Sequence, residues 1–503
     1  MTLQVLQQGT DGQPESSAQA QAKAQPAGET IVVLGCGIAG MGIALALRDS
    51  QHRIVIVERD EAAPEIEPAL AFDTWKRPGV FQFRHPHVFL GRLHRLLRER
   101  YPDLLEQLIS AGFWTVPVSA YGTFRDSYQP AEGDEDLTQL CGRRATFEYV
   151  LQRYVRALPN VSVIHGAAVD GVVLAAQGSQ RRITAIEIKR GGQRESITGD
   201  VFVDCLGRRS PVFKWLREQG CGAKEQSNEA QTLSFSRHYR LREGAHGQLT
   251  EQSGDLDFLR FAIVYGEHGH FAISFSIAEN DDELMQRVRR AEGFDQVCHA
   301  IPQVKDWVSQ AEALTPVMGV GDIRNRWIHW ADGYRPFVLG LLHAGDSARE
   351  TNPFYGRGCS AAFVDAHLVA DALLASAEPK VRARTFAAGV RRELRPYFEL
   401  SVATDKMFRA RSLAARGLPV SLLQRAQAHA YLRLAVPAAF EDQQVARTLL
   451  GIQHMRRPMS VIAASKLMAR LLYLLVRRTL RLSKPVTWTL PPPRSHILAP
   501  PQD

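Results

Sequence analysis

Residues 31–58 read IVVLGCGIAGMGIALALRDSQHRIVIVE, and this stretch decides the fold. A short run of β-branched residues, Ile31–Leu34, leads into a glycine-rich turn and then into an alanine- and leucine-rich helix over 41–48. A second apolar strand follows over 53–57 and ends at Glu58. A strand, a helix and a second strand within about thirty residues are typical of a dinucleotide-binding unit. The sequence therefore predicts an α/β fold built on a Rossmann-like domain.

The glycines of this turn have distinct tasks in such a unit. Gly35, Gly37 and Gly40 allow a tight turn, close approach of the backbone to a pyrophosphate and close packing of the helix on the strand. The helix begins near Ile38 and Ala39, so its positive end would face the phosphates. The turn follows a strand and opens a helix, which favours FAD or NAD binding over a purely structural turn.

The end of the second strand carries the residue expected to choose between nucleotides. Glu58 would accept hydrogen bonds from a ribose 2′-hydroxyl and would clash with the 2′-phosphate of NADP. Arg59 follows it directly and is included in the predicted cofactor site.

Two later segments favour FAD over NAD as the cofactor. The first is VFVDCLGRRS over 201–210, and the second is GDSARETNPFYGRG over 345–358. With the first block, they resemble the FAD-dependent aromatic hydroxylase superfamily, and most closely its polyene-epoxidase-like and uncharacterised bacterial oxidoreductase members. The resemblance covers about residues 30–375 and implies a Rossmann-like FAD-binding domain with an inserted β-sheet domain for the substrate.

The resemblance also implies roles for residues in the two later blocks. Asp204, in the Asp-x-x-Gly-x-x-Ser pattern, matches the family segment that lies beside FAD and the approach of NAD(P)H. Gly345 and Asp346 match the pair whose aspartate binds a ribityl hydroxyl of the flavin. The loop containing Pro353, Gly356 and Gly358 opens a helix near residue 359, and its amides would face the flavin pyrimidine ring and stabilise the charge of the reduced flavin.

Two arginines complete the predicted site. Arg77 begins the segment RPGVFQ over 77–82, which resembles the family segment that runs alongside the cofactor. It would make a charge-assisted bond to FAD, with a surface ion pair as the alternative. Arg144 occupies the place of a contacting residue just before a helix, with a role unrelated to the cofactor equally open.

Other features restrict the chemistry. The usual Ala-His after Gly-Asp is Ser347-Ala348 here, and the Trp-x-Trp-x-Ile-Pro signature of flavin halogenases is absent, which disfavours halogenation.

The pairs His85/His87 and His268/His270 have no third ligand at suitable spacing, so no metal site is predicted, and either pair could line the substrate cavity. Six cysteines without paired spacing exclude a disulfide framework and an iron–sulfur cluster, and they favour a cytoplasmic setting. No catalytic acid or base can be assigned.

The rest of the chain is divided by composition. Residues 1–29 are expected to be a disordered leader, because they are rich in Gln, Ala, Ser and Gly and lack an apolar core. The FAD-binding domain is predicted over 30–167 and 331–378, with a contribution from 195–227, and the substrate-binding sheet mainly over 168–330 with a helix near 281–291. A helical C-terminal region is expected over 379–484, followed by a proline-rich tail over 485–503 without regular structure.

The positive charge of the chain is concentrated at its end. The whole chain sums to +8, whereas residues 401–503 carry 16 basic and 4 acidic side chains, or +12. Between 460 and 482, Lys466, Arg470, Arg477 and Arg481 fall on one stripe of an amphipathic helix. This helix could lie peripherally on an anionic membrane surface, or it could pack on the protein with its basic stripe in water. Aromatic residues do not alternate with these arginines, so nucleic-acid binding is not expected.

The function implied by the resemblance is that of an FAD-dependent monooxygenase. NAD(P)H would serve as transient reductant, and molecular oxygen would supply one atom to a small, largely apolar organic substrate by hydroxylation or epoxidation. An FAD-dependent reductase or dehydrogenase of an isoprenoid or polyene is the alternative on the same fold. A flavoprotein that acts on or binds nucleic acid is a third reading.

Overall fold

The computed structural model describes residues 28–122, 124, 128–245, 253–332, 335–430, 434–463, 465–480 and 492–499. The predicted leader falls almost entirely outside these residues.

A five-stranded parallel sheet forms the centre of the nucleotide-binding half, in the order β21-β9-β1-β2-β5. Its strands carry buried β-branched and leucine side chains on both faces, as a sheet covered by helices requires. The two strands and the helix predicted around the first glycine turn are confirmed within three residues as β1 (Thr30–Leu34), α1 (Ile38–Ala46) and β2 (Arg53–Val57). The other strands of the sheet are β5 (Val161–Ile164), β9 (Val201–Asp204) and β21 (Leu341–His343).

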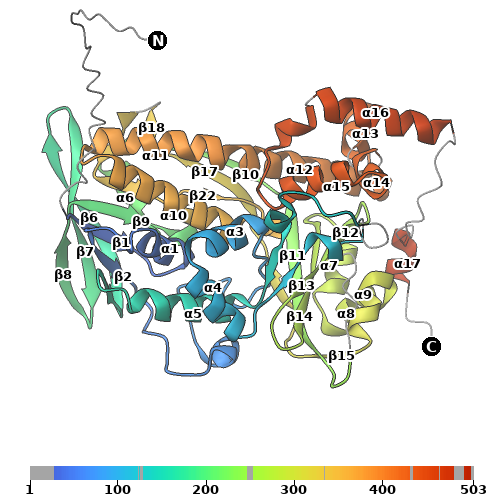
Figure 1. Ribbon diagram of the computed structural model, residues 1–503, viewed down its shortest axis with the longest axis horizontal. Helices are drawn as coiled ribbons and strands as arrows, with labels where there is room; N and C mark the ends of the chain where they lie inside the picture. The colour runs from blue at the N-terminus through green and yellow to red at the C-terminus, as the bar shows by residue number, and fades with distance from the viewer. Residues whose placement is uncertain are drawn as a thin grey trace, which may run out of the picture.

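Helices from distant parts of the chain pack against α1 and cover this sheet (Figure 1). Gly42 of α1 allows close packing on α10, because a Cβ atom there would lie 3.1 Å from the Ala366 Cβ atom. The surrounding helices are α3 (Gly91–Arg100), α4 (Pro102–Ser110), α5 (Arg144–Arg156), α10 (Gly358–Ala375) and α11 (Pro379–Glu393). Among the described helices, α10 alone has the length and hydropathy of a membrane span, and most of it is buried.

The predicted substrate sheet over 168–330 is divided between separate sheets. The six-stranded antiparallel sheet holds only β11 (Thr232–Leu241), β12 (Ser253–Asp255), β13 (Leu259–Tyr265), β14 (His270–Ala278), β15 (Ala311–Ala313) and β16 (Met318–Val320). The earlier strands β6 (Ala167–Gln177), β7 (Gln180–Arg190) and β8 (Gln193–Thr198) form a separate sheet in which β7 pairs with β20 (Val338–Leu339), and Figure 1 places them at the opposite end of the molecule. A third sheet combines β10 (Lys224–Glu229), β17 (Arg324–His329) and β22 (Arg349–Glu350).

Three helices pack on the six-stranded sheet: α7 (Asp282–Val288), α8 (Ala291–Ala300) and α9 (Pro302–Val308). The sequence predicted only the first of them, near 281–291. The other two are short, and their apolar residues (Phe294, Val297, Val304 and Trp307) resemble those of a strand region until the sheet they cover is known.

The C-terminal region is helical, as predicted, over α12 (Arg395–Ala415), α13 (Leu422–Ala430), α14 (Val436–Glu441), α15 (Gln443–Gln453) and α16 (Ser465–Thr479). The expectation of an irregular tail is wrong for its described part. Residues Arg494–Leu498 form the short helix α17 directly after Pro493. Ile497 is buried against the cluster under the six-stranded sheet, and Arg494 pairs with Asp281 at 2.8 Å. A proline preceding the first turn is compatible with a helix, since no amide hydrogen bond is lost there.

The helix α16 packs on the protein through part of its surface, and it exposes a face that is apolar rather than purely basic. Arg470 pairs with Asp442, and Arg478 pairs with Glu441 at 2.5 Å. Leu467, Leu471 and Leu474 pack into the molecule. The outward face is apolar and contains Met468, Leu472, Tyr473, Val476 and Leu480. Arg481 and the side chain of Lys466 lie outside the described residues.

A buried histidine joins the C-terminal region to the first half of the chain. The Nδ1 atom of His454 accepts a hydrogen bond from the Gly91 amide at 2.8 Å, and its Nε2 atom lies 3.1 Å from the Tyr121 hydroxyl. Nδ1 must therefore be unprotonated. Burial lowers the pKa of His454 to about 4.

We expect acid to destabilise the protein through His454. With a folded-state pKa of about 4 and an unfolded value of about 6.5, the unfolded chain takes up the proton first, so stability falls as the pH drops from about 6.5 to about 4. The loss amounts to about 3 kcal/mol. Urea unfolding at pH 7 and pH 4.5 should show a smaller pH dependence in His454→Gln than in the wild type. An equal dependence in both proteins would contradict this assignment.

Candidate functional site

The structure brings the three glycine-containing blocks together at the carboxyl ends of β1, β9 and β21. Gly35 has a φ of +103°, and a Cβ atom there would lie 2.7 Å from the carbonyl oxygen of Cys205. Gly345 has a φ of +66°, and its Cβ position lies 2.9 Å from the Ala39 Cβ atom. Both positions therefore require glycine, for backbone conformation and for space. The carboxyl end of such a sheet is where α/β folds bind ligands.

The turn before α1 has the shape of a phosphate cradle. Gly40 is held tightly, because a Cβ atom there would lie 2.0 Å from the Gly35 carbonyl oxygen. Gly37, the residue preceding α1, is open: its φ is −87°, and nothing lies within 4 Å of its Cβ position. The amides that follow, from Ile38 onward, begin the helix whose positive end faces this space. The backbone fits a pyrophosphate approaching at Gly37.

Glu58 is buried beside this turn, and its carboxylate already has three donors. One oxygen accepts from the Cys36 amide at 2.8 Å and from Arg77 at 2.8 Å, and the other accepts from the Asp60 amide at 3.0 Å. These bonds fix the carboxylate at the end of β2. Free lone pairs remain for a ribose hydroxyl, since a carboxylate has about four acceptor sites.

Arg77 occupies a place that its sequence motif did not predict. Its guanidinium bonds to Glu58, to Asp60 at 3.1 Å, to Glu148 at 3.0 Å and to the Cys36 carbonyl oxygen at 3.3 Å. These contacts use all five of its N–H donors. Arg77 is therefore the centre of a buried ion-pair network beside the turn at Cys36, and it has no donor left for the expected bond to FAD. Neither of the two roles weighed from the sequence describes it.

The neighbouring Arg59 is exposed, and one of its guanidinium nitrogens lies 3.3 Å from the Pro78 carbonyl oxygen. It lies at the edge of the predicted nucleotide site.

Asp204 also has internal partners. Its carboxylate accepts from the Leu206 amide at 3.0 Å and the Ser210 hydroxyl at 2.7 Å, and it lies 3.3 Å from Nδ1 of His343. The side chain is fully buried. Asp204 therefore shapes the 204–210 turn from within.

Asp346 lies at the start of the third block with a partly buried carboxylate. It accepts a hydrogen bond from Gln82 at 3.3 Å, which links it to the 77–82 segment. Burial raises the pKa of Asp346, and the positive charges of Arg144, Arg326 and Arg208 oppose that rise. An acceptor in such an electropositive place suits the hydroxyls of a polyol.

The loop over 352–358 connects Asp346 to α10. Gly356 has a φ of +65°, and its Cβ position lies 3.0 Å from the Cβ atom of Val88. Pro353 starts the turn, and Gly358, with nothing within 4 Å of its Cβ position, starts α10. Free amides at the beginning of a helix favour a negative charge, as the reduced flavin would place there.

A network from the C-terminal region holds this loop. Asp405 of α12 accepts from Asn352 at 2.9 Å, from the Tyr355 hydroxyl at 2.6 Å and from Asn325 at 2.7 Å. The backbone amide of Asn352 donates to the side-chain oxygen of Asn325 at 3.0 Å. One helical turn before Asp405, Ser401 accepts a bond from Arg357 at 2.6 Å. No sequence motif marks this network, because its members are isolated polar residues in separate elements.

Arg144 is buried between the glycine blocks and a cavity. Its Nη1 atom lies 2.9 Å from Nε2 of His87, and its Nε atom donates to Glu148 at 2.5 Å. Because Nδ1 of His87 lies 2.8 Å from the His85 carbonyl oxygen, the ring carries its proton on Nδ1 and accepts from Arg144 at Nε2. Burial, reinforced by Arg144, lowers the pKa of His87 and keeps it neutral. The charge of Arg144 also acts on Asp346 and Cys359.

A small enclosed cavity lies on the other side of Arg144. It has a volume of about 10 Å³, close to that needed for one water molecule, so a ring-sized substrate would have to displace side chains. Its walls combine the segment around 83–87 with the six-stranded sheet, and they are made by Phe72, Phe83, His85, Pro86, His87, Gly142, Arg143, Arg144, His238, Val264, Tyr265, Phe271 and Ala272.

Of the two histidine pairs, only His85 and His87 line this cavity, whereas His268 packs on Gly112 and His270 bonds to the Glu267 carbonyl oxygen. The sequence missed His238 on β11. Its Nε2 atom lies 2.9 Å from the Arg84 carbonyl oxygen, and burial lowers its pKa to about 4. No motif marks it, because its role depends on β11 reaching the 83–87 segment.

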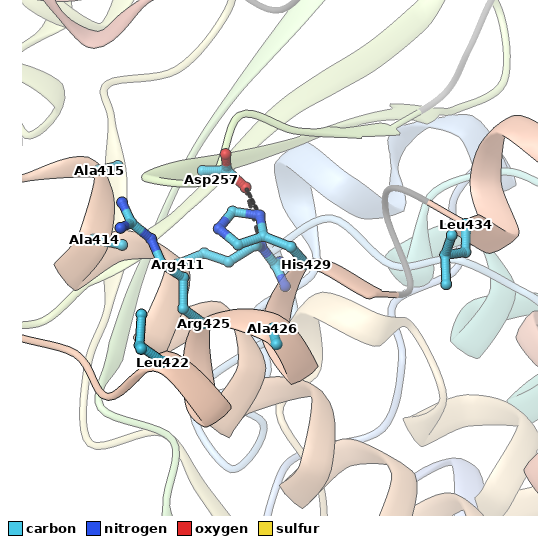
Figure 2. Close-up of a pocket in the computed structure, with 9 residues that line it drawn as sticks. All are labelled: Asp257, Arg411, Ala414, Ala415, Leu422, Arg425, Ala426, His429 and Leu434. Atoms are coloured by element: carbon cyan, nitrogen blue, oxygen red, sulfur yellow. Dashed lines mark ion pairs between the residues drawn. The ribbon is translucent and has the colours of Figure 1, made fainter. Parts of the chain in front are cut away.

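A second, larger groove lies between α12 and α13 (Figure 2). Its volume is about 710 Å³, and Asp257 lies on one wall, 3.2 Å from Nε of Arg411 and 3.8 Å from Nδ1 of His429. It shares no residue with the glycine blocks or the cavity and opens widely to solvent, so we do not assign the predicted chemistry to it. Within the described chain, no cluster of three or more His, Cys, Asp or Glu side chains is arranged to hold a metal.

Known proteins resemble this chain in structure and not in sequence. No protein-family model matches it, and no curated protein sequence matches it. p-Nitrophenol 4-monooxygenase PnpA from Pseudomonas putida is 17% identical with a TM-score of 0.58, and the alignment covers 85% of this chain and 99% of PnpA. The flavin-dependent brominase Bmp2 is 14% identical with a TM-score of 0.57, covering 90% of this chain and 99% of Bmp2.

A third similar structure is OxyS anhydrotetracycline hydroxylase from Streptomyces rimosus, 16% identical with a TM-score of 0.55, with coverage of 85% of this chain and 75% of OxyS. At sequence identities of 14% to 17%, the similarity to these structures establishes the fold alone. The alignments cover 85% to 90% of this chain and confirm the predicted fold class. The chain therefore shares its fold with these flavin-dependent and monooxygenase structures.

Proposed function

We propose that this protein is an FAD-dependent monooxygenase that inserts one oxygen atom into a small, largely apolar organic substrate, by hydroxylation or epoxidation, at the expense of NAD(P)H. The observation that carries the proposal is the meeting of three distant blocks, with Gly345 against Ala39 and Gly35 against Cys205. Two glycine-dependent contacts that join three distant blocks at one sheet edge are the arrangement that a dinucleotide site requires.

The residues assigned to FAD fall into three groups. Gly35, Gly37, Ile38, Ala39 and Gly40 would bind the pyrophosphate, and Glu58 with Arg59 nearby would receive the adenosine ribose. Asp346 after Gly345 would accept from the ribityl chain, and the loop of Pro353, Gly356 and Gly358 would face the flavin ring. Arg77 and Asp204 would support these contacts without touching the cofactor, since their polar atoms already have protein partners.

FAD would supply electron transfer from NAD(P)H and the activation of oxygen. The protein would supply position, charge and exclusion of water. Arg144 touches the cavity through His87 and acts electrostatically on Asp346, so it would set the charge at the junction of cofactor and substrate. The aromatic walls Phe72, Phe83 and Phe271 suit an apolar substrate, and neutral His85, His87 and His238 suit a hydroxyl or carbonyl group on it.

Purified protein offers a direct test. Its visible spectrum should show bound flavin, and NAD(P)H and oxygen consumption should then be followed with phenols, quinones and polyenes. Incorporation of one ¹⁸O atom per NAD(P)H supports the proposal. Anaerobic turnover of an alkene would select the reductase, and a halogenated product in the presence of bromide or chloride would select a halogenase. Failure to bind added FAD would reject all three.

Asp346→Ala should weaken FAD binding about tenfold to a hundredfold, because a charge-assisted bond contributes about 1.5 to 3 kcal/mol. Titration of FAD into the apoprotein, followed by quenching of flavin fluorescence, measures the change. Asp170→Ala is a suitable control, because Asp170 pairs with Arg194 at the surface. Equal affinities for FAD in both variants would remove Asp346 from the site.

A further inference from the structure

The described end of the chain exposes an unusual amount of apolar surface. Fifteen large hydrophobic side chains are exposed among the described residues, and nine of them fall between 418 and 480. These nine are Leu418, Leu422, Leu423, Leu434, Met468, Leu472, Tyr473, Val476 and Leu480. Figure 1 shows α13 and α16, which carry most of them, at the same end of the molecule.

On α16 these side chains form one continuous face. Met468, Leu472, Val476 and Leu480 follow one another at intervals of four residues, so they lie along one side of the helix. Leu472, Val476 and Leu480 are each more than half exposed, at 54%, 54% and 61%. The opposite side is already packed through Leu474 and its neighbours. A water-facing helix would normally show polar residues there.

Charge surrounds this apolar face. Tyr473 lies at its edge, and the guanidinium of Arg477 lies 5.7 Å from the Tyr473 ring. On α13, Leu422 and Leu423 are 84% and 68% exposed, and Arg425 follows them at the surface. Residues 401–503 sum to +12, whereas the other 400 residues sum to −4. An apolar face with a cationic border matches the boundary between the headgroups and acyl chains of an anionic bilayer.

We propose that α16 is a membrane-surface helix that inserts its Met468–Leu480 face into an anionic lipid monolayer. The helix has 15 residues, whereas a span needs about 20, so it would lie in the plane of the surface. A second copy of this chain fits the face less well, because each copy would bring the same +12 segment to the contact. This proposal is independent of the flavin assignment.

Vesicle flotation tests the proposal with the full-length protein and no substrate. Vesicles of phosphatidylcholine with 30% phosphatidylglycerol should carry the wild type upward in a density gradient, and pure phosphatidylcholine should carry less. Raising the salt concentration should weaken binding without abolishing it, because the apolar part is not screened. The variant Leu472→Glu with Val476→Glu should lower partitioning about tenfold or more, since two side chains lose their apolar contact with lipid.

The matched control is Val173→Glu with Leu314→Glu, which places two charges at exposed apolar positions on other elements. It should float like the wild type. Circular dichroism and thermal unfolding verify that both variants are folded. A wild type that stays with the dense fraction, or equal flotation of the two variants, would overturn the proposal. So would a lipid-free dimer, detected by light scattering, that the Leu472→Glu and Val476→Glu changes dissociate.

Discussion

Gly37→Val should abolish FAD binding while the protein remains folded. Gly37 has backbone angles open to any residue, and its Cβ position has no neighbour within 4 Å, so the fold can accommodate a side chain. The valine would fill the space through which the pyrophosphate reaches the first amides of α1. Losing two charge-assisted amide bonds costs about 4 kcal/mol, or about a thousandfold in affinity. Isothermal titration of the apoprotein with FAD measures this change.

Two other glycines make the result interpretable. Gly222→Val introduces the same side chain at an exposed position where the nearest atom is Phe337 Cε1 at 3.4 Å, and should bind FAD normally. Gly40→Ala should destabilise the fold itself, because its Cβ atom would lie 2.0 Å from the Gly35 carbonyl oxygen. Wild-type FAD affinity in Gly37→Val would show that the predicted turn does not bind the cofactor.

Arg77→Met should be the most destabilising single change that we predict. The guanidinium is almost fully buried between the carboxylates of Glu58, Asp60 and Glu148, and methionine would leave them without their cation. Removing one partner from a buried ion network costs about 3 to 5 kcal/mol. The free energy of unfolding in urea, measured at pH 7.5 without added FAD, should fall by this amount.

A comparison of two arginines separates this effect from a general loss of positive charge. Arg194→Met removes an arginine whose ion pair with Asp170 is exposed, and it should change stability by less than about 1 kcal/mol. Arg77→Lys should fall between the two, because an ammonium group has three donors and cannot reproduce the five of a guanidinium. If Arg77→Met is as stable as Arg194→Met, the network does not support the turn.

The fold is most predictable from the sequence where function and local structure impose the same pattern. The turn around Gly35, the strand ending at Glu58 and the Gly345-Asp346 pair are short-range signals, and the structure places all of them at one sheet edge. The partners of individual side chains at the site were harder to predict from the sequence. Arg77 was expected to bond to FAD, whereas its guanidinium pairs with Glu58, Asp60 and Glu148. A sequence motif shows the position of an arginine but not the groups that it contacts.

What the sequence missed depends on contacts between distant elements. His238 lines the cavity only because β11 lies against the 83–87 segment, and Asp405 reaches Asn352 only because α12 crosses the third block. The apolar face that α16 exposes was not predicted, since the side of the helix that packs inward depends on partners such as Glu441 and Asp442, which pair with Arg478 and Arg470. Ion pairs over such separations have no periodic signature, unlike the apolar side chains of a helix.

The bonds from Asp405 and Ser401 to the 352–357 segment change how the helical end of the chain should be regarded. A shortened protein that stopped after α10 would retain every glycine motif, yet it would leave Asn352 and Arg357 without their buried partners. The motif-bearing part is therefore not a separable module. Transplanting or trimming it would require a substitute for α12, and any gene fusion should be made outside this helix.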